Sequence, residues 1–304
     1  MEDLRDRTVL VTGATGFVGW HLCRRLRQVG AAALHATSRR VPSDPLDGFS
    51  CHQVDVCEPG PTSELMRSLR PDVIFHLAGS VSASRDVSQV LPSLQANTVA
   101  TINVLSAATE VGTGRVVTIP SLEEPVLGGD DAVPPSPYAA SKWAAGGYAR
   151  MFHALYGTPV VGARIMMMYG PAQSPSKLVP YVASCLLRGE VPRIGSPDRA
   201  VDWVYGSDVA DGLVAAALAE GVEGCTLDLG SGTLVPIREV VERLVALVDP
   251  SLRPEMAPAS DRPLEPVRVG RADETAAAVG WRASTSLEEG LARTVDWYRD
   301  RTTT

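Results

Sequence analysis

The chain has 304 residues, 45% of them apolar, and a formal net charge of −7 at pH 7. Its charges are interspersed without a basic stripe, which argues against nucleic acid as a partner. No apolar run approaches the roughly 20 residues that span a bilayer, and the opening MEDLRDR has no signal-peptide pattern, so we expect a cytoplasmic protein. The five cysteines (Cys23, Cys51, Cys57, Cys185 and Cys225) are scattered, so neither a disulfide framework nor a metal site is expected.

Short apolar runs alternate with helical patterns through the first half of the chain. The runs predict six strands, at Thr8–Thr12, Ala32–Thr37, Cys51–Val54, Val73–Leu77, Val116–Ile119 and Val160–Ile165. The intervening segments predict helices at about Phe17–Val29, Glu64–Leu69, Ser93–Val111 and Tyr138–Tyr156. Strands joined by helical crossovers predict an α/β fold with a doubly wound parallel sheet and helices on both faces.

The pattern changes after Gly170-Pro171, where prolines and glycines become frequent and strands shorten. Helices at Ser207–Ala219 and Ile237–Val248 are predicted to follow one another without long strands. We interpret residues 1–170 as one domain and residues 171–304 as a smaller C-terminal domain. The boundary between them is expected to be interdigitated.

Three glycines, Gly13, Gly16 and Gly19, lie between the first predicted strand and the helix that follows it. Glycines at this spacing give a tight turn, bring the backbone close to a pyrophosphate and let the helix pack closely on the strand. The free amides at the helix N-terminus favour phosphate charge. This turn predicts a dinucleotide site.

The end of the second strand indicates which dinucleotide binds. Ser38, Arg39 and Arg40 stand where an acidic residue would bind a free ribose 2′-hydroxyl. Guanidinium groups suit a 2′-phosphate instead, so we favour NADP(H), with NAD(H) as the alternative.

Tyr138 and Lys142 are four residues apart and therefore share one helix face. A tyrosine titrates near pH 10, and a neighbouring ammonium is expected to lower its pKa. The Tyr138–Lys142 pair predicts hydride chemistry in which Tyr138 moves the proton and the cofactor carries the hydride.

The glycine spacing and the Tyr-x-x-x-Lys pair resemble the short-chain dehydrogenase/reductase superfamily. The extended branch, the NAD-dependent epimerase/dehydratase family of nucleotide-sugar enzymes, is similar over nearly the whole chain, including Tyr169-Gly170-Pro171 and the segments DWVYGSDVADGL and GWRASTSLEEGL. The resemblance implies a Rossmann cofactor domain and a C-terminal substrate domain. It implies that Ser121, just after the predicted fifth strand, is the catalytic serine that polarises the substrate oxygen. It also implies further cofactor residues, namely Thr15, Phe17, Val18, Asp55, Val56, Leu77, Ala78, Gly79 and Asn97. His76 is interpreted as a core histidine without a catalytic role.

The same resemblance implies that a nucleoside diphosphate sugar is the substrate. The residues implied to contact it are Ser121, Glu123, Met167, Lys177, Leu178, Arg199 and Arg262. Two positions depart from the family pattern: Met167 replaces an asparagine, and Val201 stands where an arginine is usual. Pro125 also replaces a tyrosine of the family in the loop after Ser121. The identities of the base and the sugar are left open.

Three reactions use this framework: 4-epimerisation, 4,6-dehydration and 4-ketoreduction. Dehydratases carry an acidic residue directly after the catalytic hydroxyl residue, and here that position is Leu122. The string Ser121-Leu122-Glu123-Glu124 is more similar to the nucleotide 4-keto-6-deoxyhexose reductases. NADPH-dependent reduction of a nucleoside diphosphate 4-keto-6-deoxyhexose is therefore the leading hypothesis, with the epimerase next and the dehydratase last.

A protein of this fold that binds the cofactor as a regulator without turnover is a different class of function. Loss of the tyrosine or the lysine would mark it, and both are present here. The resemblance further implies a homodimer in which the helices at Ser93–Val111 and Tyr138–Tyr156 pair with their copies.

Overall fold

A computed structural model describes residues 4–40, 46–82, 84–126, 132–257, 264 and 266–302. Its centre is a seven-stranded sheet, all parallel, in the order β10-β6-β5-β4-β1-β2-β3. The strands are β1 (Thr8–Thr12), β2 (Ala33–Ser38), β3 (Ser50–Gln53), β4 (Val73–His76), β5 (Arg115–Thr118), β6 (Val160–Ile165) and β10 (Thr226–Leu229). The predicted doubly wound parallel sheet is confirmed.

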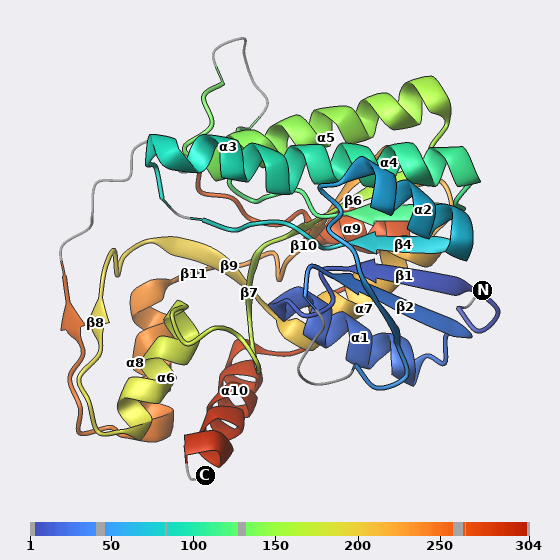
Figure 1. Ribbon diagram of the computed structural model, residues 1–304. Coiled ribbons are helices and arrows are strands. Elements are labelled where there is room, and N and C mark those ends of the chain that lie inside the picture. The colour runs from blue at the N-terminus through green and yellow to red at the C-terminus, as the bar shows by residue number, and fades with distance from the viewer. Residues whose placement is uncertain are drawn as a thin grey trace.

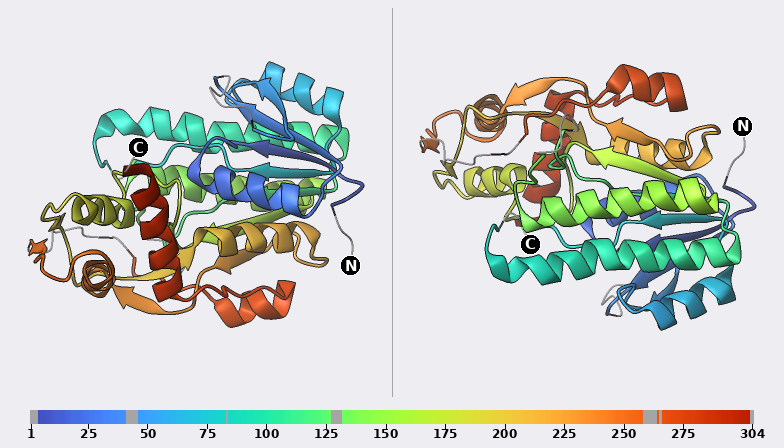
Figure 2. Two further views of the ribbon diagram at one scale, coloured as in Figure 1. Left: turned by 90° about the horizontal axis from the view of Figure 1, so that it is seen from below. Right: turned by 90° about the horizontal axis from the view of Figure 1, so that it is seen from above.

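Helices cover both faces of this sheet (Figures 1 and 2). One face carries α2 (Pro59–Leu69), α4 (Ala100–Val111) and α5 (Pro137–Tyr156), and the other carries α1 (Phe17–Gln28) and α7 (Gly206–Leu218). Successive residues of a strand point to opposite faces, and in β1 both sets are apolar and buried. Val9 and Val11 join the core under α1 and α7, while Leu10 joins the core under α2 and α4.

A second group of elements lies beside the sheet and contains its own core (Figure 1). Its three-stranded sheet has the order β11-β9-β7. Its elements are β7 (Met167–Tyr169), α6 (Leu178–Leu187), β8 (Arg193–Ile194), β9 (Ala200–Tyr205), β11 (Leu234–Pro236), α8 (Ile237–Val248), β12 (Glu255–Met256) and α10 (Leu287–Thr302). Helices α6, α8 and α10 pack against one another.

The chain passes more than once between the large sheet and the second group of elements. After β9 the chain returns to the large sheet, where α7 packs on α1 and β10 pairs with β6 as an edge strand. A last short helix, α9 (Ala272–Val279), packs on β10 before α10 rejoins the second group. Residues beyond 170 therefore build part of both groups.

Asp202 and Asp208 fix the returning segments. The buried carboxylate of Asp202, on β9, accepts four hydrogen bonds, from the backbone N–H and hydroxyl of Ser231 and from the N–H groups of Gly232 and Gly270. Asp208, on α7, accepts from the backbone of Ser284 and Thr285 at 3.1 and 2.9 Å. Each carboxylate satisfies backbone donors of a distant loop.

Three differences from the predicted elements have physical reasons. Helix α2 begins at Pro59 and not at Glu64, because prolines are tolerated in a first turn, where the N–H groups have no helical partner. The helix predicted from Ser93 is longer: a 3₁₀ turn (Val87–Gln89), α3 (Val90–Ser93) and a π-helical turn (Leu94–Val99) precede α4. Strands β9 and β10 were not predicted.

Within the described residues, no helix is long and apolar enough to cross a bilayer. The same residues contain no group of three or more His, Cys, Asp or Glu side chains arranged to hold a metal ion. All five cysteines are free thiols.

Candidate active site

The glycine turn lies at the carboxyl end of β1 and caps α1. Gly13 has a φ of +71°, which favours glycine, and a Cβ there would lie 2.6 Å from the Ala78 nitrogen. A Cβ on Gly19 would lie 2.5 Å from the Ala14 carbonyl oxygen. The first residues of α1, Phe17 and Val18, pack on the core under the sheet. The turn is therefore as tight as its glycines predict, and the open N-terminus of α1 follows it.

The end of β2 lies next to this turn, since the Gly13 N–H donates to the Thr37 carbonyl at 3.3 Å. Arg39 and Arg40 are exposed directly after β2, and the Ser38 hydroxyl donates to the Arg40 carbonyl. Their side chains are accessible to a ligand that lies across the turn.

The segment after β3 reaches the same edge of the sheet. The Asp55 carboxylate accepts from the Cys57 N–H at 3.0 Å. The Val56 carbonyl accepts from the Asn103 side chain of α4 at 3.1 Å, and the Val56 side chain is buried. This segment thus has a fixed backbone at the position predicted to contact the cofactor.

His76 is a fully bonded core residue, as interpreted from the sequence. Its ring nitrogens contact the hydroxyls of Thr12 at 2.8 Å and Thr101 at 3.1 Å. Burial, with a smaller contribution from the charge of Lys142, lowers its pKa to about 3. Thr12 also accepts from the Ala78 N–H at 3.1 Å, so His76 orders the segment that contains Leu77, Ala78 and Gly79.

Asn97 lies in the π-helical turn, which adds one residue to the helical repeat at this point. Its side chain accepts from the Ser80 N–H at 2.9 Å, donates to the Ser80 carbonyl at 3.0 Å and donates to the Ser141 hydroxyl at 2.9 Å. Asn97 therefore joins the segment after β4 to the helix that carries the tyrosine and the lysine.

Tyr138 and Ser121 are in contact. Their side chains form a hydrogen bond, and Ser121 is buried at the end of the strand continued from β5. Burial raises the pKa of Tyr138 to about 12, while the Ser121 hydrogen bond opposes this shift. Tyr138 is thus a protonated phenol at neutral pH. The sequence predicted a pKa lowered by Lys142, and this prediction is wrong because burial raises the pKa of Tyr138.

Lys142 lies one helical turn after Tyr138, and its ammonium donates to the Ile119 carbonyl at 3.2 Å. Burial lowers its pKa to about 8, and the carboxylate of Glu124 partly offsets that decrease. A Cβ on Gly79 would lie 3.4 Å from the Lys142 nitrogen, so the segment after β4 approaches the lysine closely. Ser121, Tyr138 and Lys142, which come from two separate segments, therefore lie together.

Glu124 and Arg268 hold the loop after Ser121, and neither role was predicted from the sequence. The buried Glu124 carboxylate accepts from the Ser121 N–H at 2.8 Å. Burial raises the pKa of Glu124, whereas the Ser121 hydrogen bond and the nearby cations lower it. The Arg268 guanidinium donates to the carbonyls of Leu122 at 3.1 Å and Glu124 at 2.8 Å.

Part of the predicted substrate set lies near this loop. Met167 and Arg199 line one small pocket together with Leu122 and Arg268. The Glu123 N–H donates to the Ser121 hydroxyl at 3.1 Å, so Glu123 also borders the site.

The other predicted substrate residues are placed differently. Lys177 is exposed at the N-cap of α6, and Leu178 packs against the core of the second group. Arg262 lies outside the described residues. Trp203 is a core residue whose indole N–H donates to the Val235 carbonyl at 3.0 Å.

A glycine turn at the first strand of a doubly wound sheet and a contiguous serine, tyrosine and lysine define the class of protein. The chain is a short-chain dehydrogenase/reductase of the extended type.

The comparisons give the family. The chain matches the NAD dependent epimerase/dehydratase family over residues 9–230, and it belongs to this family of enzymes. It is 31% identical to a UDP-glucose 4-epimerase of Mycolicibacterium smegmatis over 96% of this chain and 98% of that protein. It is 30% identical to a dTDP-glucose 4,6-dehydratase of Actinoplanes sp. over 96% of this chain and 97% of that protein.

Solved structures agree with this placement. The UDP-glucose 4-epimerase of Thermotoga maritima with UDP-glucose has a TM-score of 0.87 at 22% identity, covers 97% of this chain and 99% of its own, and shows the common fold. MoeE5 in complex with UDP-glucuronic acid and NAD has a TM-score of 0.84 at 30% identity and covers 97% and 99% of the two chains.

Replacing Glu124 by glutamine tests its action on Lys142. The amide oxygen still accepts from the Ser121 N–H, but the charge that raises the lysine pKa is lost. The pKa of Lys142 is therefore expected to fall below about 8, and the alkaline limb of kcat/KM is expected to move to lower pH. A pH profile identical to that of the unmodified enzyme would show that Glu124 has no electrostatic role.

Proposed function

We propose that this enzyme transfers a hydride between a nicotinamide cofactor and C4 of a nucleoside diphosphate sugar, and that it works as an NADPH-dependent 4-ketoreductase of 4-keto-6-deoxyhexoses. The observation that favours reduction is the pair of exposed guanidiniums of Arg39 and Arg40, which suit the 2′-phosphate of an exchangeable NADPH. Reduction of a ketone needs a proton donor, and burial holds Tyr138 in its protonated form.

The residues present fit a bound dinucleotide. The turn at Gly13, Gly16 and Gly19 offers backbone N–H groups at the start of α1 for a pyrophosphate, and its close contact with Ala78 leaves no room for side chains. Lys142 would hold the nicotinamide ribose hydroxyls, and Asp55 and Val56 would contact the adenine. When bound, the nicotinamide donates or accepts the hydride.

Ser121, Tyr138 and Lys142 have separate roles in the proposed reaction. Ser121 donates a hydrogen bond to the sugar oxygen and polarises it, while Tyr138 passes its proton to that oxygen as the carbonyl is reduced. Lys142, held by the Ile119 carbonyl, supplies positive charge beside the phenol as the phenolate forms. Leu122 follows Ser121 where elimination of water would need an acid, which speaks against dehydration.

A 4-epimerase is the second candidate. The 31% identity to a UDP-glucose 4-epimerase over nearly the full length favours it, and the same serine, tyrosine and lysine would serve both directions of hydride transfer. The two candidates differ in whether the nicotinamide exchanges in each turnover.

One assay separates them. The purified protein is incubated with NADPH or NADH and a panel of nucleoside diphosphate 4-keto-6-deoxyhexoses, and the nicotinamide absorbance is followed. Stoichiometric oxidation of NADPH supports the reductase. Interconversion of 4-hydroxy epimers without net oxidation would assign the epimerase, and neither reaction would reject both proposals.

Cofactor preference is tested at the end of β2. The double variant Arg39→Ala/Arg40→Ala removes the two exposed guanidiniums that would contact a 2′-phosphate. The KM for NADPH is expected to rise about 100-fold, while the KM for NADH changes less than about 3-fold. Equal increases for both cofactors would contradict the NADP(H) preference.

The proposed homodimer rests on one surface. Exposed apolar side chains gather on the helical run before α4 and on α5, and include Leu91, Leu94, Tyr148 and Leu155. Light scattering at micromolar concentration is expected to give twice the chain mass of 32.2 kDa. A monomer at that concentration would reject the dimer.

A further inference from the structure

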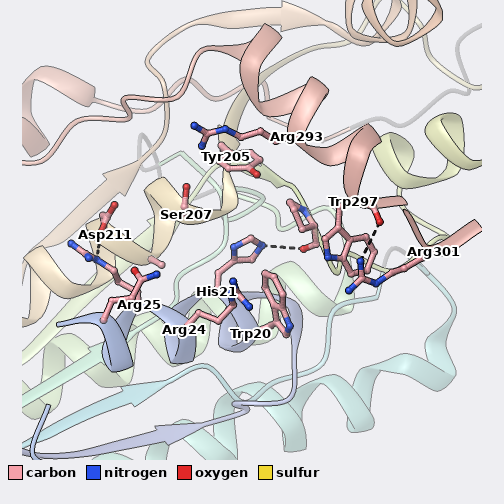
Figure 3. A pocket seen from close by; sticks show the side chains of 13 residues that line it. Trp20, His21, Arg24, Arg25, Tyr205, Ser207, Asp211, Arg293, Trp297 and Arg301 are labelled. Carbon is pink, nitrogen blue, oxygen red and sulfur yellow. Dashed lines mark hydrogen bonds and ion pairs between the residues drawn. The ribbon is translucent and has the colours of Figure 1, made fainter. Parts of the chain in front are cut away.

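A second cavity lies between α1, α7 and α10, away from the candidate active site (Figure 3). Its volume is about 580 Å³, within the range of about 300–1,000 Å³ that is usual for small-molecule sites. None of the residues assigned above to catalysis, cofactor or sugar lines it.

Two tryptophan–arginine pairs with the same sequence spacing border the cavity. On α1, Trp20 is followed four residues later by Arg24, whose guanidinium carbon lies 4.7 Å from the indole centroid. On α10, Trp297 is followed four residues later by Arg301, at 3.9 Å. Each guanidinium lies over an indole, where a cation–π interaction stabilises it, and its remaining N–H groups can donate to a ligand. Two helices far apart in sequence thus bring matching donors to one cavity.

The charge of the cavity is opposite to that of the whole chain. Four arginines line it against a single aspartate, although the net charge of the protein is −7. Arg25 is paired with Asp211, and Arg293 is paired with Glu289 at 2.5 Å. In the part of the chain that the structure describes, Arg24 and Arg301 have no carboxylate partner. Within the described residues the charges of these two guanidiniums are therefore not paired with a carboxylate, and Arg301 also donates to the Trp297 carbonyl at 3.3 Å.

The remaining polar groups are neutral. His21, on α1, is buried, and its Nε2 contacts the Pro171 carbonyl at 3.1 Å (Figure 3). Burial lowers the pKa of His21 to about 4, so it carries no charge at neutral pH. Ser207, in the first turn of the 13-residue helix α7, places a hydroxyl and the positive end of that helix at the cavity.

We propose that this cavity is a second, non-catalytic binding site for a polyphosphate chain, which a nucleotide or an inorganic polyphosphate would carry. The guanidiniums of Arg24 and Arg301, on separate helices, suit neighbouring phosphoryl groups, because each forms paired hydrogen bonds with one phosphate. Since α1 begins at the glycine turn and α10 packs on α6 and α8, the ligand joins the two groups of elements.

Calorimetric titration of the full chain tests the site. The protein is first saturated with NADP⁺, the cofactor form proposed above, so that the dinucleotide site is occupied, and is then titrated with UDP or with tripolyphosphate. Arg24→Ala/Arg301→Ala is expected to weaken one binding event about 100-fold, because two charged hydrogen-bonding groups are lost. Arg27→Ala is the matched control: it also lies on α1, is paired with Asp47 at 3.6 Å and does not line the cavity.

The two probes identify the source of the ligand. Tighter binding of UDP at the arginine-dependent site assigns it to nucleotides, and tighter binding of tripolyphosphate assigns it to inorganic polyphosphate. The proposal is overturned if neither probe has an arginine-dependent site, or if Arg27→Ala weakens binding equally. Should the double variant not fold, Arg301→Ala alone is expected to lose about 10-fold. The titration measures the number and affinity of phosphate-binding sites and requires no turnover. Its outcome therefore does not depend on whether the proposed reaction is correct.

Discussion

The Tyr138→Phe enzyme is expected to fold normally and to lose between about 100-fold and 10,000-fold of its hydride-transfer rate. The substitution removes only the hydroxyl that bonds to Ser121 and would pass its proton to the sugar oxygen. The half-buried ring remains, so the packing of α5 is retained. The measurement is kcat under saturating cofactor and substrate, together with the thermal midpoint of unfolding.

Tyr156→Phe is the matched control. This tyrosine is exposed at the C-terminal end of the same helix, and its ring packs on Phe152 at a centroid distance of 5.3 Å. Its rate should equal that of the unmodified enzyme. Retained turnover in Tyr138→Phe would show that another group supplies the proton.

Asp202→Ala is expected to lower the free energy of unfolding by about 3–5 kcal/mol. The substitution leaves the N–H groups of Ser231, Gly232 and the buried Gly270 without their acceptor. Urea unfolding followed by circular dichroism measures the change. Asp198→Ala, at an exposed carboxylate paired with Arg238, should change the stability by less than about 1 kcal/mol. Equal effects of the two substitutions would contradict the anchoring role of Asp202.

Local patterns predicted the sheet well. Most strands of the first half contain a short apolar run, and in a sheet covered on both faces such strands are buried at every residue, as in β4 and β5. The edge strand β3, with the sequence SCHQ, is mostly exposed. The glycine turn, Ser121, Tyr138 and Lys142 were visible because each depends on spacing within one segment. The predicted start of α2 was wrong, because Pro59 is tolerated in the first turn of the helix.

The residues that sequence reasoning missed act over long distances. Arg268 reaches the loop at Leu122 across 146 positions, and Asp202 bonds to Gly270 across 68. Contacts between residues so far apart leave no periodic pattern in the local sequence. Glu124 is different: a second glutamate next to Glu123, three residues after Ser121, could have suggested a side chain that turns back to the Ser121 N–H. The cavity at Trp20 and Trp297 carried a usable signal too, since the tryptophan–arginine spacing repeats.

The edge position of β10 has a consequence for biosynthesis. When only the first 170 residues have left the ribosome, β6 is an unpaired edge strand. Its neighbour β10 (Thr226–Leu229) has not yet been made. The face of the sheet that α7 covers is bare at that stage as well. A nascent chain of this length therefore presents apolar surface and an open strand together, which is the combination that chaperones bind and that aggregation begins from. Expression of residues 1–170 alone is expected to give insoluble protein, whereas a fragment that extends past α9 is expected to complete the sheet.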